Sequence, residues 1–250
     1  MIKSGLLFND TVMLMQEFGM IKKVVSLFLL VFCIQTAVFA GDRAEFINLG
    51  FSDNSETFLF GQYGKNESGT LLYADVIYHD LASGENSREL SLSKTYPDSQ
   101  RSGNNGLSAL LMSLKEYNSI YNVEVDYNQT GTTLYFQLPG QITGDLISFS
   151  DYQVGIIYDV SFVMRPQIRE PGTNTALAIT LFQTLRDGTQ SRFEAGSLTK
   201  PIQNVYDFQL KQIIVSPQRD CVVLVFQTTE YDEDNDTTNI RYFVDSVKIK

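Results

Sequence analysis

The sequence contains few of the residues from which metal centres and nucleophilic sites are usually built. Its 250 residues include one His, two Cys and no Trp. Zinc sites need three or four His and Cys ligands, so a zinc site is not expected. A Ser–His or Cys–His nucleophile would have to use His79, the one imidazole of the chain. Two cysteines also exclude a disulfide-rich framework.

Basic residues and phosphate-holding motifs are scarce as well. Lys and Arg number 19 against 29 Asp and Glu, which gives a formal net charge of −10. Because nucleic-acid binding needs clustered basic side chains, we expect no nucleic-acid partner. The sequence has no Gly-x-x-x-x-Gly-Lys loop, no Gly-x-Gly-x-x-Gly loop and no Gly-x-Ser-x-Gly elbow. Neither a phosphate cradle nor nucleophilic catalysis is therefore indicated.

No hydrophobic run is as long as a membrane-spanning helix. The run Val24–Ile34 covers about 11 residues, whereas a spanning helix needs roughly 20. It follows a pair of lysines, and it precedes Val38 and Ala40, which suit the −3 and −1 positions before Gly41. This is the pattern of a secretory signal peptide over residues 20–40, cleaved after Ala40.

Two other interpretations of this segment are weaker. An uncleaved anchor would need a longer apolar run, and a lipoprotein would need a small residue rather than Phe32 before Cys33. Residues 1–19 add nothing that a signal requires. We interpret them as an upstream extension, with Met20 as the start.

We therefore expect an exported protein, periplasmic or extracellular, whose mature chain is a single β-rich domain over residues 41–250. Residues 1–40 hold three Lys and two acidic residues, so the mature chain would carry a net charge of −11. It would keep Cys221 alone, without a disulfide, and no later run is long enough for a transmembrane span. Its apolar content, 43% in the whole chain, is sufficient for a sizeable core.

Period-two alternation of apolar and polar residues dominates residues 41–250 and predicts half-buried β-strands. Asp187-Gly188 between two such segments predicts a hairpin turn, because Gly accepts the positive φ that the turn requires. The continuous apolar run Val222–Phe226 predicts a strand buried on both faces. The alternating apolar sets are Val123, Val125 and Tyr127; Leu134, Phe136 and Leu138; Ile156, Tyr158, Val160, Phe162 and Met164; Leu177, Ile179 and Leu181; and Ile240, Tyr242 and Val244.

One segment has helical spacing instead. We expect an amphipathic helix at about 107–121 that packs a stripe of leucines on a sheet, with a partner-binding helix as the alternative. The loop at 102–106 precedes it and is a candidate for the N-terminal cap. The stripe consists of Leu107, Leu110, Leu111, Leu114 and Tyr121.

Two segments, Asn48–Phe60 and Ile213–Val225, resemble each other. In each, an apolar stretch leads into a Ser, four polar turn residues and an apolar strand. This pattern is typical of a hairpin in a β-propeller blade, and Leu71–Gly84 resembles the next hairpin of the same blade. The helix fits no blade. We therefore expect a mainly β fold, with antiparallel sheets of propeller-blade-like or sandwich-like hairpins and one amphipathic helix.

Three stretches also carry a family resemblance: Gly41–Ser52, Phe58–Gly64 and Asn239–Asp245. They are similar to a family of bacterial predicted secreted proteins, a domain of unknown function. The resemblance would span most of residues 41–250, with its motifs mainly at the two ends. It implies export and a single domain, and it implies no activity, ligand or catalytic residue.

His79 and Cys221 are the two side chains from which a nucleophilic site could be assembled. His79 precedes Asp80 at the end of an apolar strand, where a locally bonded His is favoured over a general base. Cys221 begins a strand that reads as buried, which favours an unreactive core thiol. We therefore assign no catalytic residue.

The acidic stretch near the C-terminus offers a weak calcium site. Asp232, Asp234 and Asp236 alternate in the way that a calcium loop begins, because oxygen ligands must converge on the cation. The motif then fails, since Thr237 stands where an EF-hand needs Gly and Phe243 where it needs the bidentate Glu. We favour a solvated acidic hairpin loop and expect no other cofactor.

The leading functional hypothesis is a non-enzymatic interaction module of the bacterial envelope, with a protein partner in the envelope or outside the cell. One alternative is a glycan hydrolase that uses paired carboxylates, because acidic residues are plentiful and sequence cannot place them relative to one another. The other alternative is a calcium-stabilised ligand-binding domain.

Overall fold

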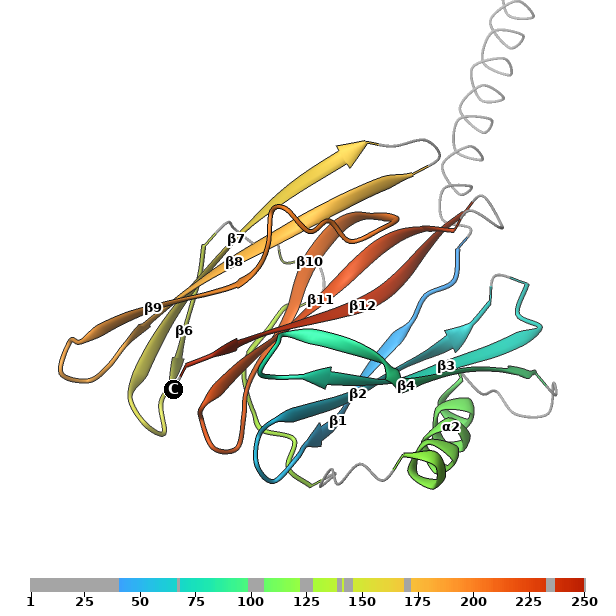
Figure 1. Cartoon of the computed structure of the whole chain (residues 1–250), viewed down its shortest axis with the longest axis horizontal. Coiled ribbons are helices and arrows are strands. Elements are labelled where there is room, and N and C mark those ends of the chain that lie inside the picture. The colour runs from blue at the N-terminus through green and yellow to red at the C-terminus, as the bar shows by residue number, and fades with distance from the viewer. Residues whose placement is uncertain are drawn as a thin grey trace, which may run out of the picture. The chain divides into compact units, whose positions relative to one another are not determined.

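In this computed structural model, the described residues form three four-stranded antiparallel sheets and one helix (Figure 1). The mainly β, antiparallel fold predicted from the alternation is confirmed. The structure describes residues 41–66, 68–98, 106–121, 128–138, 141, 146–168, 172–232 and 237–249.

The first sheet is a meander in which each strand pairs with the next along the chain. The hairpin predicted at Leu71–Gly84 is confirmed, and Gly84 closes its turn with φ +70°. At the other hairpin, the turn after Phe51 returns the chain so that Phe51 pairs with Phe58. The strands are β1 (Glu45–Phe51), β2 (Thr57–Lys65), β3 (Leu71–Asp80) and β4 (Glu85–Pro97).

The third sheet is also a meander, in the order β6-β7-β8-β9. The predicted Asp187-Gly188 turn joins its last two strands. Gly188 has φ +84°, and the Leu185 N–H donates to the Thr189 carbonyl oxygen at 2.9 Å. The strands are β6 (Leu146–Asp151), β7 (Ile156–Ile168), β8 (Thr173–Thr184) and β9 (Gln190–Gly196).

The central sheet has the order β12-β11-β10-β5. Three strands that are consecutive in the chain lie side by side, and β5, from earlier in the chain, pairs with the free edge of β10. The strand expected at 123–127 as the hairpin partner of β5 lies outside the described residues, and β5 pairs with β10. The strands are β5 (Thr132–Phe136), β10 (Val205–Val215), β11 (Cys221–Asp232) and β12 (Thr237–Lys248).

Strand β11 places the central sheet between the other two. From Val222 to Phe226, the even-numbered side chains pack against the third sheet and the odd-numbered ones against the first sheet. Both faces of the strand are therefore buried, as the continuous apolar run predicted. The sheets are stacked in layers, which corresponds to the sandwich-like form of the prediction rather than to a complete propeller.

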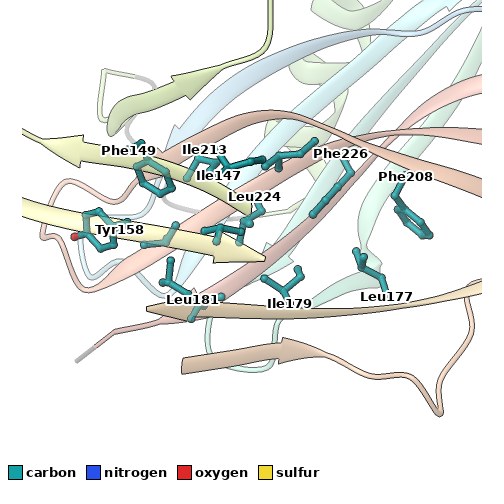
Figure 2. Packing of buried hydrophobic residues seen from close by; sticks show 14 of the residues in the cluster. Ile147, Phe149, Tyr158, Leu177, Ile179, Leu181, Phe208, Ile213, Leu224 and Phe226 are labelled. Atoms are coloured by element: carbon teal, nitrogen blue, oxygen red, sulfur yellow. The ribbon is translucent and has the colours of Figure 1, made fainter. Parts of the chain in front are cut away.

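The largest core lies between the central and third sheets (Figure 2). Phe226 stands at its centre, with edge-on ring contacts to Phe162 at 5.7 Å and Phe208 at 6.1 Å between centroids. Tyr158 stacks on Phe149 toward the β6 end of the same core. Each large side chain buried in this way contributes about 1.5–3 kcal/mol by removal of apolar surface from water.

Helix α2 (Leu107–Ile120) covers the outer face of the first sheet and confirms the predicted helix. Three residues of the expected stripe, Leu110, Leu114 and Tyr121, pack on the sheet, whereas Leu107 and Leu111 are exposed. Leu110 is fully buried over Gly61, where a Cβ would approach Leu110 Cδ1 to 2.8 Å. Because Gly61 has no side chain, it leaves the space in which Leu110 packs against the sheet. The buried helix residues are Ala109, Leu110, Ser113 and Tyr117.

The loop at 102–106 supplies the N-cap of the helix, as predicted, through its last residue. This N-cap is Gly106, in the left-handed region with φ +97°, and no side chain makes a capping hydrogen bond. A Cβ at this position would lie 2.8 Å from the carbonyl oxygen of Gly64. Close packing of the turn against β2 therefore requires glycine here, and a Ser or Asn cap would not fit.

The two resembling segments form two hairpins with the same turn. In the first, Ser52 Oγ accepts the Thr57 N–H at 3.0 Å; in the second, Ser216 Oγ accepts the Cys221 N–H at 3.1 Å. The residue three positions after each Ser has a left-handed backbone, with φ +50° at Ser55 and +55° at Arg219. The sequence repeat is therefore a repeat of structure at the hairpin level.

The two turns predict opposite effects of the same substitution. Ser55→Gly should raise the free energy of unfolding by about 1 kcal/mol, because it removes left-handed strain and a buried hydroxyl without a described partner. Arg219→Gly should lower it by about 2 kcal/mol, because Arg219 Nε pairs with buried Asp151 at 2.8 Å. Urea unfolding of both variants measures this. A loss of stability in Ser55→Gly would contradict the assigned turn.

Candidate functional site

A cavity of about 780 Å³ opens where the three sheets meet along β12, an edge strand of the central sheet. The β3–β4 turn forms one wall, and β9 with the loop that follows it forms the opposite wall. Its lining is mixed: ten of the 18 lining residues are polar or charged, six are apolar and two are glycines. Among the lining residues are Leu81, Leu177, Ile202, Phe243 and Asp245.

Asp245 is the buried charged group of this cavity. Its side chain comes from the C-terminal third of β12, and the residue is 4% exposed. Gly84 and Gly196 border the carboxylate from the two walls: a Cβ at either would lie 3.2 Å from Oδ1 or 3.3 Å from Oδ2. Both glycines have positive φ angles, in the left-handed region that favours Gly over other residues. Backbone from both walls therefore lies close to the two oxygens of the acid.

Among the described residues, the carboxylate of Asp245 has no positively charged partner. Within the described part of the chain its one hydrogen bond comes from the Ser246 N–H, at 2.8 Å, and none of the ion pairs includes it. Burial raises the pKa of Asp245 to about 6, against the opposing effect of that N–H. A buried acid without a partner is costly, which makes this group a candidate for function.

The charged residues around the mouth of the cavity are exposed. Lys200 approaches Glu85 at 3.5 Å across the gap between the two walls, and both side chains are largely in water. Glu194 pairs with its neighbour Arg192 on β9. Such exposed pairs stabilise the fold little, because water screens their charges. Asp245 is therefore the dominant charge in the interior of the cavity.

His79 lies on the other face of β12 and is completely buried. Its Nε2 is 3.0 Å from Ser246 Oγ and its Nδ1 is 2.8 Å from Asn86 Oδ1. With the Asn86 oxygen facing the ring, Nδ1 donates and Nε2 accepts the Ser246 hydroxyl hydrogen. The predicted local bond is present, and a distant bond across two sheets accompanies it.

The Ser246–His79–Asn86 array has the order of a nucleophilic triad but not its electrostatics. Burial lowers the pKa of His79 to about 4, so the imidazole is a weak base at neutral pH. Cys221 lies in the same core, and burial raises the pKa of its thiol to about 12. A thiol of this kind is not a nucleophile. The array therefore holds the first sheet on β12.

The weak calcium candidates are only partly within the described residues. Asp232 ends β11, and its Oδ2 accepts a hydrogen bond from Asn239 Nδ2 at 3.1 Å. Asp234 and Asp236 lie outside the described residues. Elsewhere in the described chain, His, Cys, Asp and Glu side chains do not gather in groups of three that suit a metal ion.

The sequence analysis did not single out Asp245. A signal was present, since period-two alternation along β12 assigns its position to the face that carries Phe243 and Val247. An acid at a core-facing position of an alternating strand contradicts the pattern. Such a contradiction marks a candidate site, but the sequence does not show that two glycines from distant hairpins border it.

Comparisons of the chain with protein-family models, with curated proteins and with solved structures gave no match. The family resemblance therefore stays a prediction. In the described part of the chain, no helix has the length and apolar character that a membrane crossing requires.

The position of Asp245 predicts a stabilising substitution. Its pKa is raised on folding, so the folded chain loses stability as pH rises from about 4 to 6, and the full cost is present at pH 7. Asp245→Asn should therefore raise Tm at pH 7.5, because it should increase the free energy of unfolding by at most about 3 kcal/mol. This increase should vanish near pH 4.

Thermal unfolding at both pH values measures this difference. Asp207→Asn makes the same chemical change at an exposed position on β10 and is the matched control, expected to leave Tm unchanged. A lower Tm for Asp245→Asn at pH 7.5 would show that the carboxylate has a stabilising partner.

Proposed function

We propose that the chain is an exported, non-enzymatic binding module of the bacterial envelope, and that the cavity at Asp245 is its binding site. The observation that carries this proposal is a buried carboxylate that lines a cavity of about 780 Å³ and has no cationic partner among the residues that the structure describes. Cavities of this volume accommodate small ligands or a few side chains of a partner. The acid costs stability in the free protein, and a ligand would offset that cost.

The rest of the molecule supports binding rather than catalysis. The imidazole nearest the cavity is buried and weakly basic, and the one described thiol is buried as well. The walls of the cavity belong to three sheets that share continuous cores, so the site is preformed. Preformed sites bind without the cost of ordering a loop.

Export is the second part of the proposal and rests on the sequence. The signal pattern over residues 20–40 ends at Ala40, and the β-rich unit begins at Gly41. A binding module at the cell envelope would meet small molecules or protein partners outside the cytoplasm. We propose that the partner lies outside the cytoplasm, and we do not name the molecule.

The test recovers the tagged full chain from native envelopes and examines its N-terminus and its bound molecules. We expect Gly41 as the first residue, and native mass spectrometry should show added mass on the intact protein. Ala82→Trp, which puts a large ring at the cavity wall, should abolish that mass. Ser119→Trp, an exposed change at the end of α2, is the matched control.

Three results would overturn the proposal. An unprocessed N-terminus would contradict export. Absence of added mass on the wild-type chain, or the same mass on Ala82→Trp, would contradict the assigned site.

The glycan hydrolase is a second candidate, favoured by one observation. Asp245 has a raised pKa, as a general acid needs, and Glu85 and Glu194 line the same cavity. We expect that, if the chain cleaves glycans, Asp245→Asn and one of Glu85→Gln and Glu194→Gln abolish release of reducing ends from cell-wall material. Full activity in Asp245→Asn, or no activity in the wild type, would eliminate this candidate.

A further inference from the structure

The chemistry of the cavity indicates which class of ligand it accepts. We infer that the ligand carries an alkylammonium group, a protonated amine on a short apolar stem, and that the ammonium pairs with the Asp245 carboxylate. This inference rests on the proposed function, since it identifies the ligand of the same site.

The first argument is the missing charge. Carboxylates that are almost fully buried in folded proteins are paired or bound to a cation. Asp245 receives one backbone N–H and no Lys, Arg or His within the described residues. The interior of the hollow therefore has an acceptor for a positive charge that the protein itself does not supply.

The second argument distinguishes between kinds of cation. A calcium ion takes six to eight oxygen ligands, and no group of three acidic side chains lies together among the described residues. A guanidinium binds best when both carboxylate oxygens are free for a bidentate contact. Here Oδ1 already accepts the Ser246 N–H. A compact ammonium needs one oxygen and satisfies its remaining donors elsewhere.

The shape around the carboxylate supports the same choice. Gly84 and Gly196 approach the two carboxylate oxygens so closely that even a methyl group at either position would crowd them. We therefore expect a group of small cross-section on a slender stem to reach the carboxylate more readily than a branched or planar cation does.

The apolar part of the lining accounts for the stem. Leu81 and Leu177 are buried, and Phe243 and Ile202 are half-buried at the edge of the core between the central and third sheets. A chain of a few methylenes along these side chains would remove apolar surface from water, at about 0.8 kcal/mol for each buried methylene. Alkylamines and lysine side chains have this form.

The other charged groups that face the cavity are all exposed. Glu85 and Arg88 come from the β3–β4 turn and β4, Glu194 and Lys200 from β9 and its loop, and Lys248 from β12. Their signs nearly balance, so they neither repel a cation strongly nor replace it. The net charge of the chain, −10, favours approach of a cation from solution.

The experiment is a ligand-observed NMR titration of the full processed chain with matched probes at millimolar concentration. Pentylammonium should bind, whereas pentan-1-ol, pentylguanidinium and calcium ions should bind at least tenfold more weakly. Asp245→Asn should lose at least tenfold in affinity for pentylammonium, and Asp207→Asn should keep it. At pH 5 the wild type should bind about tenfold more weakly than at pH 7.5, because Asp245 is then mostly protonated.

Two sources of the ammonium group are distinguished by a second pair of probes. Tighter binding of Nα-acetyl-lysine methylamide than of pentylammonium would assign a lysine side chain of a partner, and the reverse order would assign a free amine. Nα-acetyl-norleucine methylamide, which lacks the charge, should not bind in either case.

Equal affinity of Asp245→Asn and wild type, or equal binding of pentan-1-ol and pentylammonium, would overturn the inference. These results are separable from failure of the proposed function. If mass captured from envelopes is lost in Ala82→Trp while no amine probe binds, the cavity is a binding site for another ligand class. If neither is observed, both conclusions fail.

Discussion

The fold depends on one constraint, which is that β11 has apolar side chains on both faces. A strand of this kind is stable only between two layers, so the run Val222–Phe226 requires a sheet on each side. The first sheet meets it through Phe58 and Phe60, and the third sheet meets it through Phe162. Helix α2 then covers the outer face of the first sheet. The layered order thus follows from the burial requirement of a single strand.

The same constraint determines where a site can form. The edge strand β12 belongs to the central layer, and the cavity lies along it. The β3–β4 turn and β9 reach past this edge and form the walls of the cavity. Asp245 lies on that edge strand, where a polar side chain can enter the sandwich without interrupting the core. A site at the junction of three layers needs no special loop.

Much of this fold is predictable from the sequence, and the exceptions have specific causes. Alternation and the Asp187-Gly188 turn define strands and hairpins because they depend on neighbouring residues alone. The helix and most of its sheet-facing stripe were predicted, but the exposure of Leu107 and Leu111 was not, because it depends on how the helix packs over Gly61, which lies far from it in the sequence. Asp245 was missed for the same reason. Its importance comes from Gly84 and Gly196, which lie far from it in the sequence, and from the lack of a partner.

Asp245 lies on one face of β12 and His79, from β3, packs on the other. Their titrations have opposite effects on the free energy of unfolding. The pKa of His79 is lowered on folding, so its contribution is present above about pH 6.5 and is lost as pH falls toward 4. The pKa of Asp245 is raised, so the fold gains stability over much of the same interval as pH falls. The two effects largely cancel between pH 4 and 6. A flat stability profile in the wild type would therefore conceal an acid that destabilises the chain at neutral pH. The cost of this acid to the fold at neutral pH is the reason that we propose a binding role for it.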